Sequence, residues 1–219
     1  MDPLKIYPLF RGFRRKRMQW FIEQCRPAAG TTILDVGGFS DFWRDSGVPA
    51  QITILRPEGA EILPPGSPAN IRSIAGDGCD LREHADKSYD IVFSNSVIEH
   101  VGGEERQRAF ARESLRVGRS VWVQTPAREF PLEPHLLTPF IHWLPQRLQE
   151  RLLPWTVWAL VRTPPPRAED YVSVRARLLS RREMRDLFPG ARIFTERFFG
   201  LPKSYVAFVP ASASSPRGR

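Results

Sequence analysis

Short apolar runs alternate with stretches of helical spacing along most of the chain, and this alternation is the main indication of its fold. Seven runs are strand candidates, and the one at 89–94 is continuous enough to be buried on both faces, as parallel strands are. The seven runs lie at residues 31–36, 52–55, 71–75, 89–94, 119–124, 191–199 and 204–209. Helical spacing predicts an amphipathic helix over 9–27 and further helices over 104–115 and 181–188. This order indicates an α/β fold with helices on both faces of a mostly parallel sheet.

The last two runs depart from the parallel pattern. Only a few residues join 191–199 to 204–209, too few for a parallel crossover, so we expect the last strand to be antiparallel. The result is a seven-stranded sheet in one domain over residues 1–210. The tail at 211–219 is small and polar and is expected to be disordered.

A segment after the fifth run, residues 127–172, breaks the rhythm and predicts a helical insertion that acts as a cap or lid. Three interpretations remain open for it. The segment closes over a substrate and excludes water, or it lies on an anionic membrane face, or its tryptophans pack against the sheet edge. The side chains concerned are Trp143, Trp155 and Trp158 with Arg147, Arg151 and Arg162.

Composition sets limits on the class of protein. The chain has 219 residues, of which 42% are hydrophobic and 26% charged, enough for one globular domain with a sizeable core. Cys25 and Cys79 are the only cysteines, which excludes a disulfide framework and a four-cysteine zinc site. The longest strongly apolar run, 152–161, is half of the ~20 residues that a membrane span needs. We expect a cytoplasmic protein, either free or peripheral to the inner face of the membrane.

The chain is strongly basic. Its net charge of +8 comes from 32 basic and 24 acidic residues, and 28 of the basic residues are arginine. A positive field favours anionic partners such as phosphates, nucleic acid or an anionic membrane. A preference for arginine codons in the source genome explains the same excess.

The first strand-to-helix turn is the place where a ligand site is expected. In an open parallel sheet, ligands bind beyond the carboxyl ends of the strands, where the strand order reverses. The turn contains Asp35, Gly37 and Gly38. Glycines let the backbone turn sharply and approach a ligand, and the carboxylate can accept a hydrogen bond from the loop or from a ligand ammonium group. An ordinary glycine turn is the alternative.

Three sequence blocks, of which this turn is part of the first, give further evidence for a ligand site. They are ILDVGG at 33–38, GDGCDL at 76–81 and YDIVFSNSVIEHV at 89–101. In this order the chain resembles the small-molecule type of the class I methyltransferases that depend on S-adenosylmethionine (SAM). The resemblance covers roughly residues 15–126 and implies a three-layer Rossmann-like fold with SAM as the cofactor.

The resemblance also implies which residues bind SAM. The glycine turn would line the methionine end of SAM. The aspartate of the second block would accept a hydrogen bond from the adenine amino group, with a glycine beside the ring. The asparagine after the fourth strand would face cofactor and substrate. These residues are Asp35, Gly37 and Gly38, then Asp77 and Gly78, then Asn95.

Two features depart from the family pattern. Phe39 and Asp41 stand where the usual loop has glycines, and their side chains would reshape the approach of the ligand. The acidic residue that normally ends the second strand and binds the ribose is missing, because the chain there reads Leu55-Arg56-Pro57-Glu58. A scaffold that has kept the fold and lost the cofactor is therefore an alternative to an enzyme.

The third block supplies a candidate catalytic pair. His100 follows Glu99 just beyond the fourth strand, so a base with an orienting carboxylate is one interpretation, and hydrogen bonding to backbone is the other. In similar ubiquinone-pathway O-methyltransferases this pair is associated with a divalent ion and an earlier acidic residue. Ser96 takes that earlier place here, so we predict no metal.

A second candidate pair lies at the start of the insertion. Prolines flank Glu133 on both sides in the sequence Pro131-Leu132-Glu133-Pro134-His135 and restrict the backbone there. We predict His135 as the base or substrate-orienting residue, with Glu133 beside it. A structural loop that contains a hydrogen-bonded histidine is the alternative, and we assign no role to His84 and His142.

These observations favour SAM-dependent methyl transfer to a hydroxyl or carboxylate of a small molecule, a sugar or a lipid-linked glycan. An RNA methyltransferase or RNA-binding protein is a second interpretation, suggested by the arginines. Base N-methylation usually comes with an Asn/Asp-Pro-Pro-aromatic motif after the fourth strand, and residues 95–98 read NSVI. Nucleic acid is therefore the less favoured partner.

Overall fold

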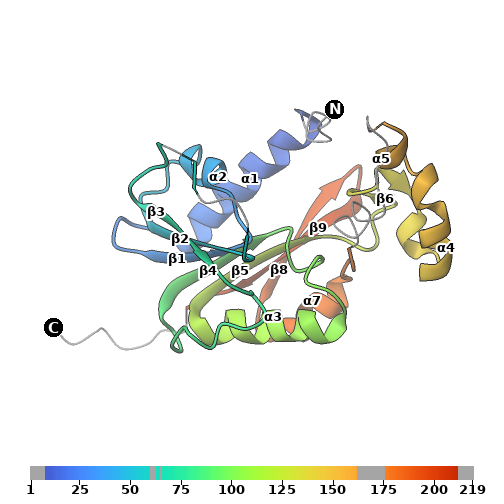
Figure 1. The fold of residues 1–219 in the computed structure, drawn as a ribbon. Coiled ribbons are helices and arrows are strands. Elements are labelled where there is room, and N and C mark those ends of the chain that lie inside the picture. The colour runs from blue at the N-terminus through green and yellow to red at the C-terminus, as the bar shows by residue number, and fades with distance from the viewer. Residues whose placement is uncertain (1–7, 60–62, 65, 162–175, 212–219) are drawn as a thin grey trace.

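A seven-stranded sheet forms the centre of the molecule (Figure 1). The computed structural model describes residues 8–59, 63–64, 66–161 and 176–211. The strands are β1 (Thr32–Val36), β2 (Gln51–Arg56), β3 (Ile71–Ala75), β4 (Tyr89–Asn95), β5 (Gly118–Pro126), β8 (Arg192–Phe198) and β9 (Leu201–Val209). Their order across the sheet is β3-β2-β1-β4-β5-β9-β8, so the strand order reverses between β1 and β4.

Strand directions follow the prediction from the sequence. The five strands β1 to β5 pair in parallel, and β9 pairs antiparallel with both β5 and β8. A tight turn at Phe199 and Gly200, both with positive φ, joins β8 to β9. The seven-stranded α/β fold with a reversed last strand is therefore confirmed.

Helices cover both faces of the sheet. On one face lie α1 (Pro8–Cys25) and the short α2 (Ser40–Arg44), where Phe21 contacts Trp43, Phe93 and Trp122 edge to face. On the other face lie α3 (Glu104–Val117) and α7 (Arg181–Leu187), and Phe110 of α3 is completely buried there. Two apolar clusters, one on each side of the sheet, hold these layers together.

The insertion after β5 stands to one side of the sheet (Figure 1). It contains β6 (Leu132–Glu133), β7 (Thr138–Pro139), η2 (Ile141–Trp143), α4 (Gln146–Leu152), η3 (Leu153–Trp155) and α5 (Val157–Leu160). A small apolar cluster of its own holds the insertion together, with Leu136, Ile141 and Trp158 at its centre.

Some of the sequence predictions need correction or fall outside the described residues. The interpretation in which all three insertion tryptophans are packed is wrong, because Trp158 is 2% exposed whereas Trp143 and Trp155 are 51% and 74% exposed. Trp158 also packs within the insertion, and not against the sheet edge. The end of the predicted insertion (162–172) and the predicted disordered tail from residue 212 onward lie outside the described residues.

Candidate active site

The turn after β1 requires glycine at two consecutive positions. Gly37 has a φ of +78°, and a Cβ there would lie 2.6 Å from a methyl carbon of Val97. A Cβ at Gly38 would overlap the carboxylate of Asp35. The backbone therefore passes directly over this carboxylate at the carboxyl end of the sheet.

The Asp35 carboxylate lies under the glycine turn and is completely buried. Its Oδ2 accepts a hydrogen bond from Trp43 Nε1 at 2.5 Å, and Oδ1 has no hydrogen-bond partner among the described residues. Burial raises the pKa of Asp35 to about 7, although the hydrogen bond from Trp43 acts in the opposite direction. A buried acceptor without a partner calls for a donor, and a ligand ammonium group at the glycine turn fits this requirement.

The first departure from the family pattern, Phe39, has an exposed side chain. The Phe39 side chain is 62% exposed, and the Arg56 guanidinium lies 4.8 Å from its ring centre. The ring thus points toward the end of β2. Arg56 itself ends β2, so a cation stands where the resemblance implies a ribose-binding acid.

Asp77 and Gly78 follow β3 and lie at the same end of the sheet. Asp77 Oδ1 accepts a hydrogen bond from Cys79 N at 2.9 Å, and both its oxygens accept from Arg106 Nη2. Burial alone would raise the pKa of Asp77, but the bonds from Cys79 and Arg106 outweigh it and hold the pKa below its ordinary value. A Cβ at Gly78 would lie 2.6 Å from Val36, so close packing on β1 requires this glycine.

Asn95 is part of a buried polar network that the sequence did not reveal. Arg17 of α1 donates to Asn95 Oδ1 and, at 2.6 Å, to Gln124 Oε1. The same guanidinium forms two hydrogen bonds with Glu196, at 3.0 and 3.1 Å. The side-chain oxygen of Asn95, a residue predicted to face the cofactor, therefore accepts a hydrogen bond from Arg17 of α1. A glutamate in the middle of an apolar strand was the only sequence signal for this network.

The three predicted catalytic residues come together at the carboxyl end of β4. His135 Nδ1 lies 2.7 Å from Glu133 Oε1, and His135 Nε2 lies 3.0 Å from His100 Nε2. Glu133 is 3% exposed, whereas His100 is exposed. The line Glu133–His135–His100 thus runs from the interior of the insertion to the surface.

Charge at this cluster favours a protonated His135. Burial alone would lower the pKa of His135, but the hydrogen bond with Glu133 and the charges of Glu133 and Glu99 outweigh it and raise the pKa. Burial also raises the pKa of Glu99 to about 7, partly offset by His135. Glu99 Oε2 accepts from Thr125 Oγ1 at 2.9 Å, and Glu99 Oε1 is buried without a hydrogen-bond partner among the described residues.

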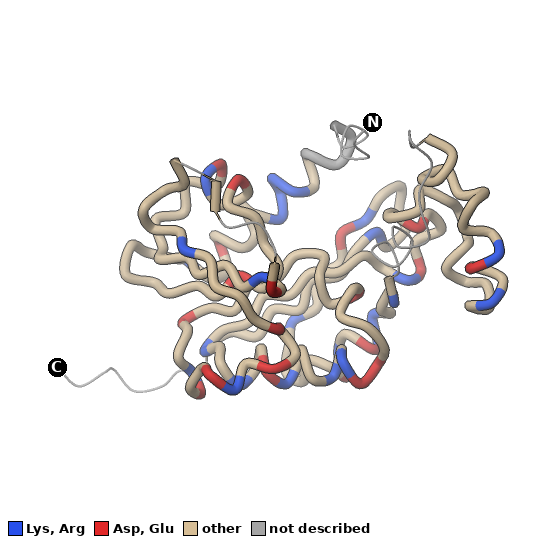
Figure 2. The backbone as a smooth tube through the Cα atoms, in the orientation of Figure 1, with Lys and Arg blue, Asp and Glu red and all other residues tan. Residues whose placement is uncertain are grey.

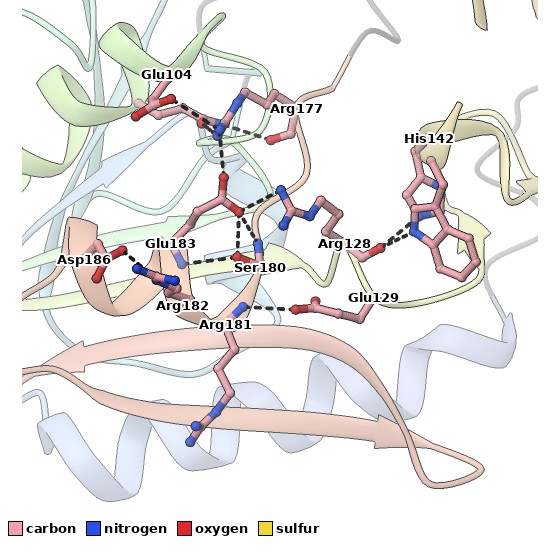
Figure 3. A network of polar contacts seen from close by, with 12 residues as sticks. Glu104, Arg128, Glu129, His142, Arg177, Ser180, Arg181, Arg182, Glu183 and Asp186 are labelled. Atoms are coloured by element: carbon pink, nitrogen blue, oxygen red, sulfur yellow. Dashed lines mark hydrogen bonds and ion pairs between the residues drawn. The ribbon is translucent and has the colours of Figure 1, made fainter. Parts of the chain in front are cut away.

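A set of contacts fixes the two stems of the insertion beside Glu99. Arg128 N donates to Leu179 O at 3.0 Å, and Arg177 N donates to Glu99 O at 2.8 Å. Figure 3 shows the side chains of Arg128 and Arg177 converging on Glu183, at the start of α7. Both stems are therefore anchored to the main domain, which fixes the position of the β6 segment and His135.

The turn after β4 connects the glycine turn with the histidines. The Val97 side chain occupies the space that a Cβ at Gly37 would need. Three residues further on, His100 N donates to Val97 O at 2.8 Å. The predicted cofactor end and the predicted catalytic end of the site thus share one short turn.

The same cluster offers donor atoms to a metal ion. One ligand atom from each of Glu99, His100 and His135 lies within 4.8 Å of the others. The prediction that no metal takes part is not tested by this geometry, and a chelator experiment below addresses it.

Comparisons with known proteins agree with this architecture. Residues 51–120 match the family model described as "Methyltransferase domain". A SAM-dependent methyltransferase from Aquifex aeolicus has a similar structure, with a TM-score of 0.51, 14% identity, and coverage of 95% of this chain and 98% of that one. A phosphoethanolamine N-methyltransferase from Haemonchus contortus, solved in complex with SAM, has a TM-score of 0.51 and 12% identity, and the match covers 82% of this chain but only 38% of that one. No curated protein sequence matches the chain.

The fold and the family match together define the class. The chain has the architecture of the class I SAM-dependent methyltransferases, and residues 51–120, from β2 to β5, carry the sequence of a methyltransferase domain. The resemblance to this class is confirmed by the fold and by the family match, which includes the second and third sequence blocks but not ILDVGG at 33–38. SAM is the cofactor of this class.

Proposed function

We propose that the protein transfers a methyl group from SAM to a hydroxyl group of a small molecule, a sugar or a lipid-linked glycan. The observation that carries this proposal is the line Glu133–His135–His100, which the β4 turn places next to the glycine turn. A hydroxyl acceptor must lose a proton, so it requires a base, whereas an ionised carboxylate acceptor does not. The histidine pair therefore favours a hydroxyl over a carboxylate.

Four positions would hold SAM. Asp35 Oδ1 would accept a hydrogen bond from its ammonium group, and the glycines at 37 and 38 let the backbone approach the methionine end. Asp77 would accept from the adenine amino group through the lone pairs that Arg106 and Cys79 leave available. When bound, SAM supplies a methyl group that its sulfonium has already activated for in-line transfer, so the protein mainly aligns the reactants.

The histidine pair would take up the acceptor proton. With Glu133 ionised, its bond to His135 keeps a proton on Nδ1, so Nε2 is the basic atom of a neutral His135. His100 would donate to that atom through its own Nε2, at 3.0 Å. The acceptor proton would therefore reach His135 by way of His100, whose Nδ1 takes it up as its Nε2 proton passes to His135. The hydrogen bond with Glu133 and the charges of Glu133 and Glu99 raise the pKa of His135, which makes it a stronger base.

SAM-induced stabilisation tests the cofactor site. At a SAM concentration 100 times its Kd, the wild-type protein should gain about 2.7 kcal/mol in the free energy of unfolding. Asp35→Asn should remove most of this gain, because the buried acceptor for the ammonium group loses its charge. Thermal unfolding with and without SAM measures both effects, and Asp186→Asn, an exposed carboxylate of α7, is the matched control. A wild-type protein that gains no stability from SAM would support the scaffold alternative.

The same substitution has a second consequence, in the absence of SAM. The folded pKa of Asp35, about 7, lies above its unfolded value of about 3.8. The contribution of Asp35 to stability is therefore fully present below pH 4 and falls as the pH rises toward 7. Asp35→Asn should raise the melting temperature at pH 8 and change it little at pH 4. Equal effects at both pH values would contradict burial of an ionising carboxyl group.

A pH profile tests the role of Glu133. A neutral His135 is the active base, so turnover should rise as the pH increases through the pKa of His135. Glu133→Gln removes the charge that raises this pKa, so the acidic limb of the profile should move to lower pH, and the plateau should fall as the orientation of His135 is lost. Glu150→Gln, on α4 of the same insertion, should leave the limb in place. An unchanged limb in Glu133→Gln would exclude His135 as the titrating group.

A further inference from the structure

The helix α5 presents apolar side chains on its exposed side as well as on its buried side. Trp158 and Ala159 are buried in the insertion, while Val157, Leu160 and Val161 are 41%, 66% and 42% exposed. These three positions follow the i, i+3, i+4 spacing of one helix face. A helix that is apolar all round is normally covered on every side, so the exposed face of α5 indicates a further contact.

The exposed apolar surface continues beyond α5. Val157 N donates to Thr138 Oγ1 at 3.0 Å, which brings α5 next to the β7 turn. There the Phe140 and Trp143 rings contact each other with centres 5.2 Å apart, and both are about half exposed. We call this surface the insertion patch; it consists of Phe140, Trp143, Trp155, Val157, Leu160 and Val161.

The insertion also carries exposed cations on α4. Arg147 and Arg151 are exposed on α4, and Glu150 is the only acidic residue between 136 and 161. In Figure 1 the start of α1 and the hairpin between β8 and β9 point toward the same end of the molecule as α5. Figure 2 shows basic residues along α1 and on α4. The exposed cations of α1 are Arg14, Arg15 and Lys16.

The hairpin between β8 and β9 adds an apolar tip at this end. Phe199 at the turn is 91% exposed, and Leu201 after it is 47% exposed. The hairpin lies against the start of α1, because the rings of Phe13 and Phe198 are in edge contact with centres 6.1 Å apart. An exposed aromatic side chain at a hairpin tip, next to a basic helix, has the same character as the insertion patch.

We propose that the insertion patch is a docking surface for an anionic membrane. Its apolar side chains would enter the lipid at the level of the headgroups, and the arginines of α4 with the cations of α1 would contact lipid phosphates. Tryptophan suits this boundary because it combines an apolar body with one polar N–H.

The flanking cations favour an anionic membrane over a second copy of this basic chain. Within the described residues no helix has the length and apolar character to cross a bilayer, so contact would be confined to the surface. The inference does not depend on the proposed reaction.

Vesicle sedimentation of the full chain tests this proposal without SAM or an acceptor. The wild-type protein should sediment with phosphatidylcholine vesicles that contain phosphatidylglycerol, much less with pure phosphatidylcholine, and less as the salt concentration increases. Trp155→Ser/Leu160→Ser should weaken the partitioning at least about tenfold through loss of buried apolar area. Arg147→Gln/Arg151→Gln should weaken binding to the anionic vesicles only.

Matched variants separate this surface from a general charge or solubility effect. Arg182→Gln/Arg185→Gln makes the same charge change on exposed positions of α7 and should bind vesicles like the wild-type protein. Circular dichroism should show that every variant remains folded. Equal sedimentation with both kinds of vesicle, no sedimentation of the wild-type protein, or a dimer that the Trp155→Ser/Leu160→Ser variant dissociates would each overturn the proposal.

Discussion

Replacing His135 by alanine is expected to lower turnover by about 10²–10⁴-fold, the usual contribution of a well-placed general base. The loss should appear in kcat, while SAM-induced stabilisation stays at the wild-type level, because the substitution leaves the proposed SAM-binding residues of the glycine turn and Asp77 in place. Steady-state kinetics with SAM and thermal unfolding with SAM measure the two quantities on the same protein. A fall in SAM affinity without a fall in kcat would remove His135 from the catalytic role.

Two controls make this result specific. His84→Ala changes a histidine whose Nδ1 lies 3.3 Å from the Tyr89 hydroxyl, at the amino end of β4 and away from the site. It should leave turnover unchanged. Treatment of the wild-type enzyme with a chelator should also leave turnover unchanged if the histidine pair acts as a base. Loss of turnover that a divalent ion restores would instead assign Glu99, His100 and His135 to a metal site and contradict the prediction of no metal.

The second large effect concerns stability. Arg17→Met should lower the free energy of unfolding by about 3–5 kcal/mol, because it leaves the buried Glu196 carboxylate without its partner. The Arg17 and Glu196 side chains are 9% and 2% exposed, and the remaining partner of Glu196 is the Ser204 hydroxyl. Chemical denaturation monitored by tryptophan fluorescence gives the free energy directly.

A double variant tests the physical reason. Arg17→Met/Glu196→Leu should recover most of the lost stability, since an apolar pair of similar volume removes the unpaired charge. Arg15→Met, an exposed position of the same helix, should change stability by less than about 0.5 kcal/mol. A double variant no more stable than Arg17→Met would show that the network acts through its shape and not through the charge of Glu196.

The buried strands could be predicted from the sequence because each is a continuous apolar run. The predicted strand at 89–94 corresponds to β4 (Tyr89–Asn95), and the one at 119–124 to β5, which extends to Gly118–Pro126. The extension adds Gly118, which pairs with Tyr89 of β4, and Thr125 and Pro126, which pair with β9. The β6–β7 hairpin was not predicted, because two residues in each strand are too few for a periodic pattern.

The site could be predicted only where its parts are close in sequence. Glu133 and His135 are two residues apart, and proline on both sides of Glu133 made them a recognisable unit. Their contact with His100, 35 residues earlier, depends on the path of the insertion. Arg17 belongs to the basic run at 14–17, and its burial is decided by Glu196, 179 residues away. No local pattern carries such information.

The separate apolar cluster of the insertion has a consequence for how acceptor choice can evolve. Leu136, Ile141 and Trp158 stabilise the insertion without contributing to either cluster of the sheet. Substitutions among the outer residues of this module can therefore accumulate while the cofactor domain keeps its stability. With the insertion as the proposed cap over the acceptor, such substitutions would change the choice of acceptor while the stems keep His135 in place.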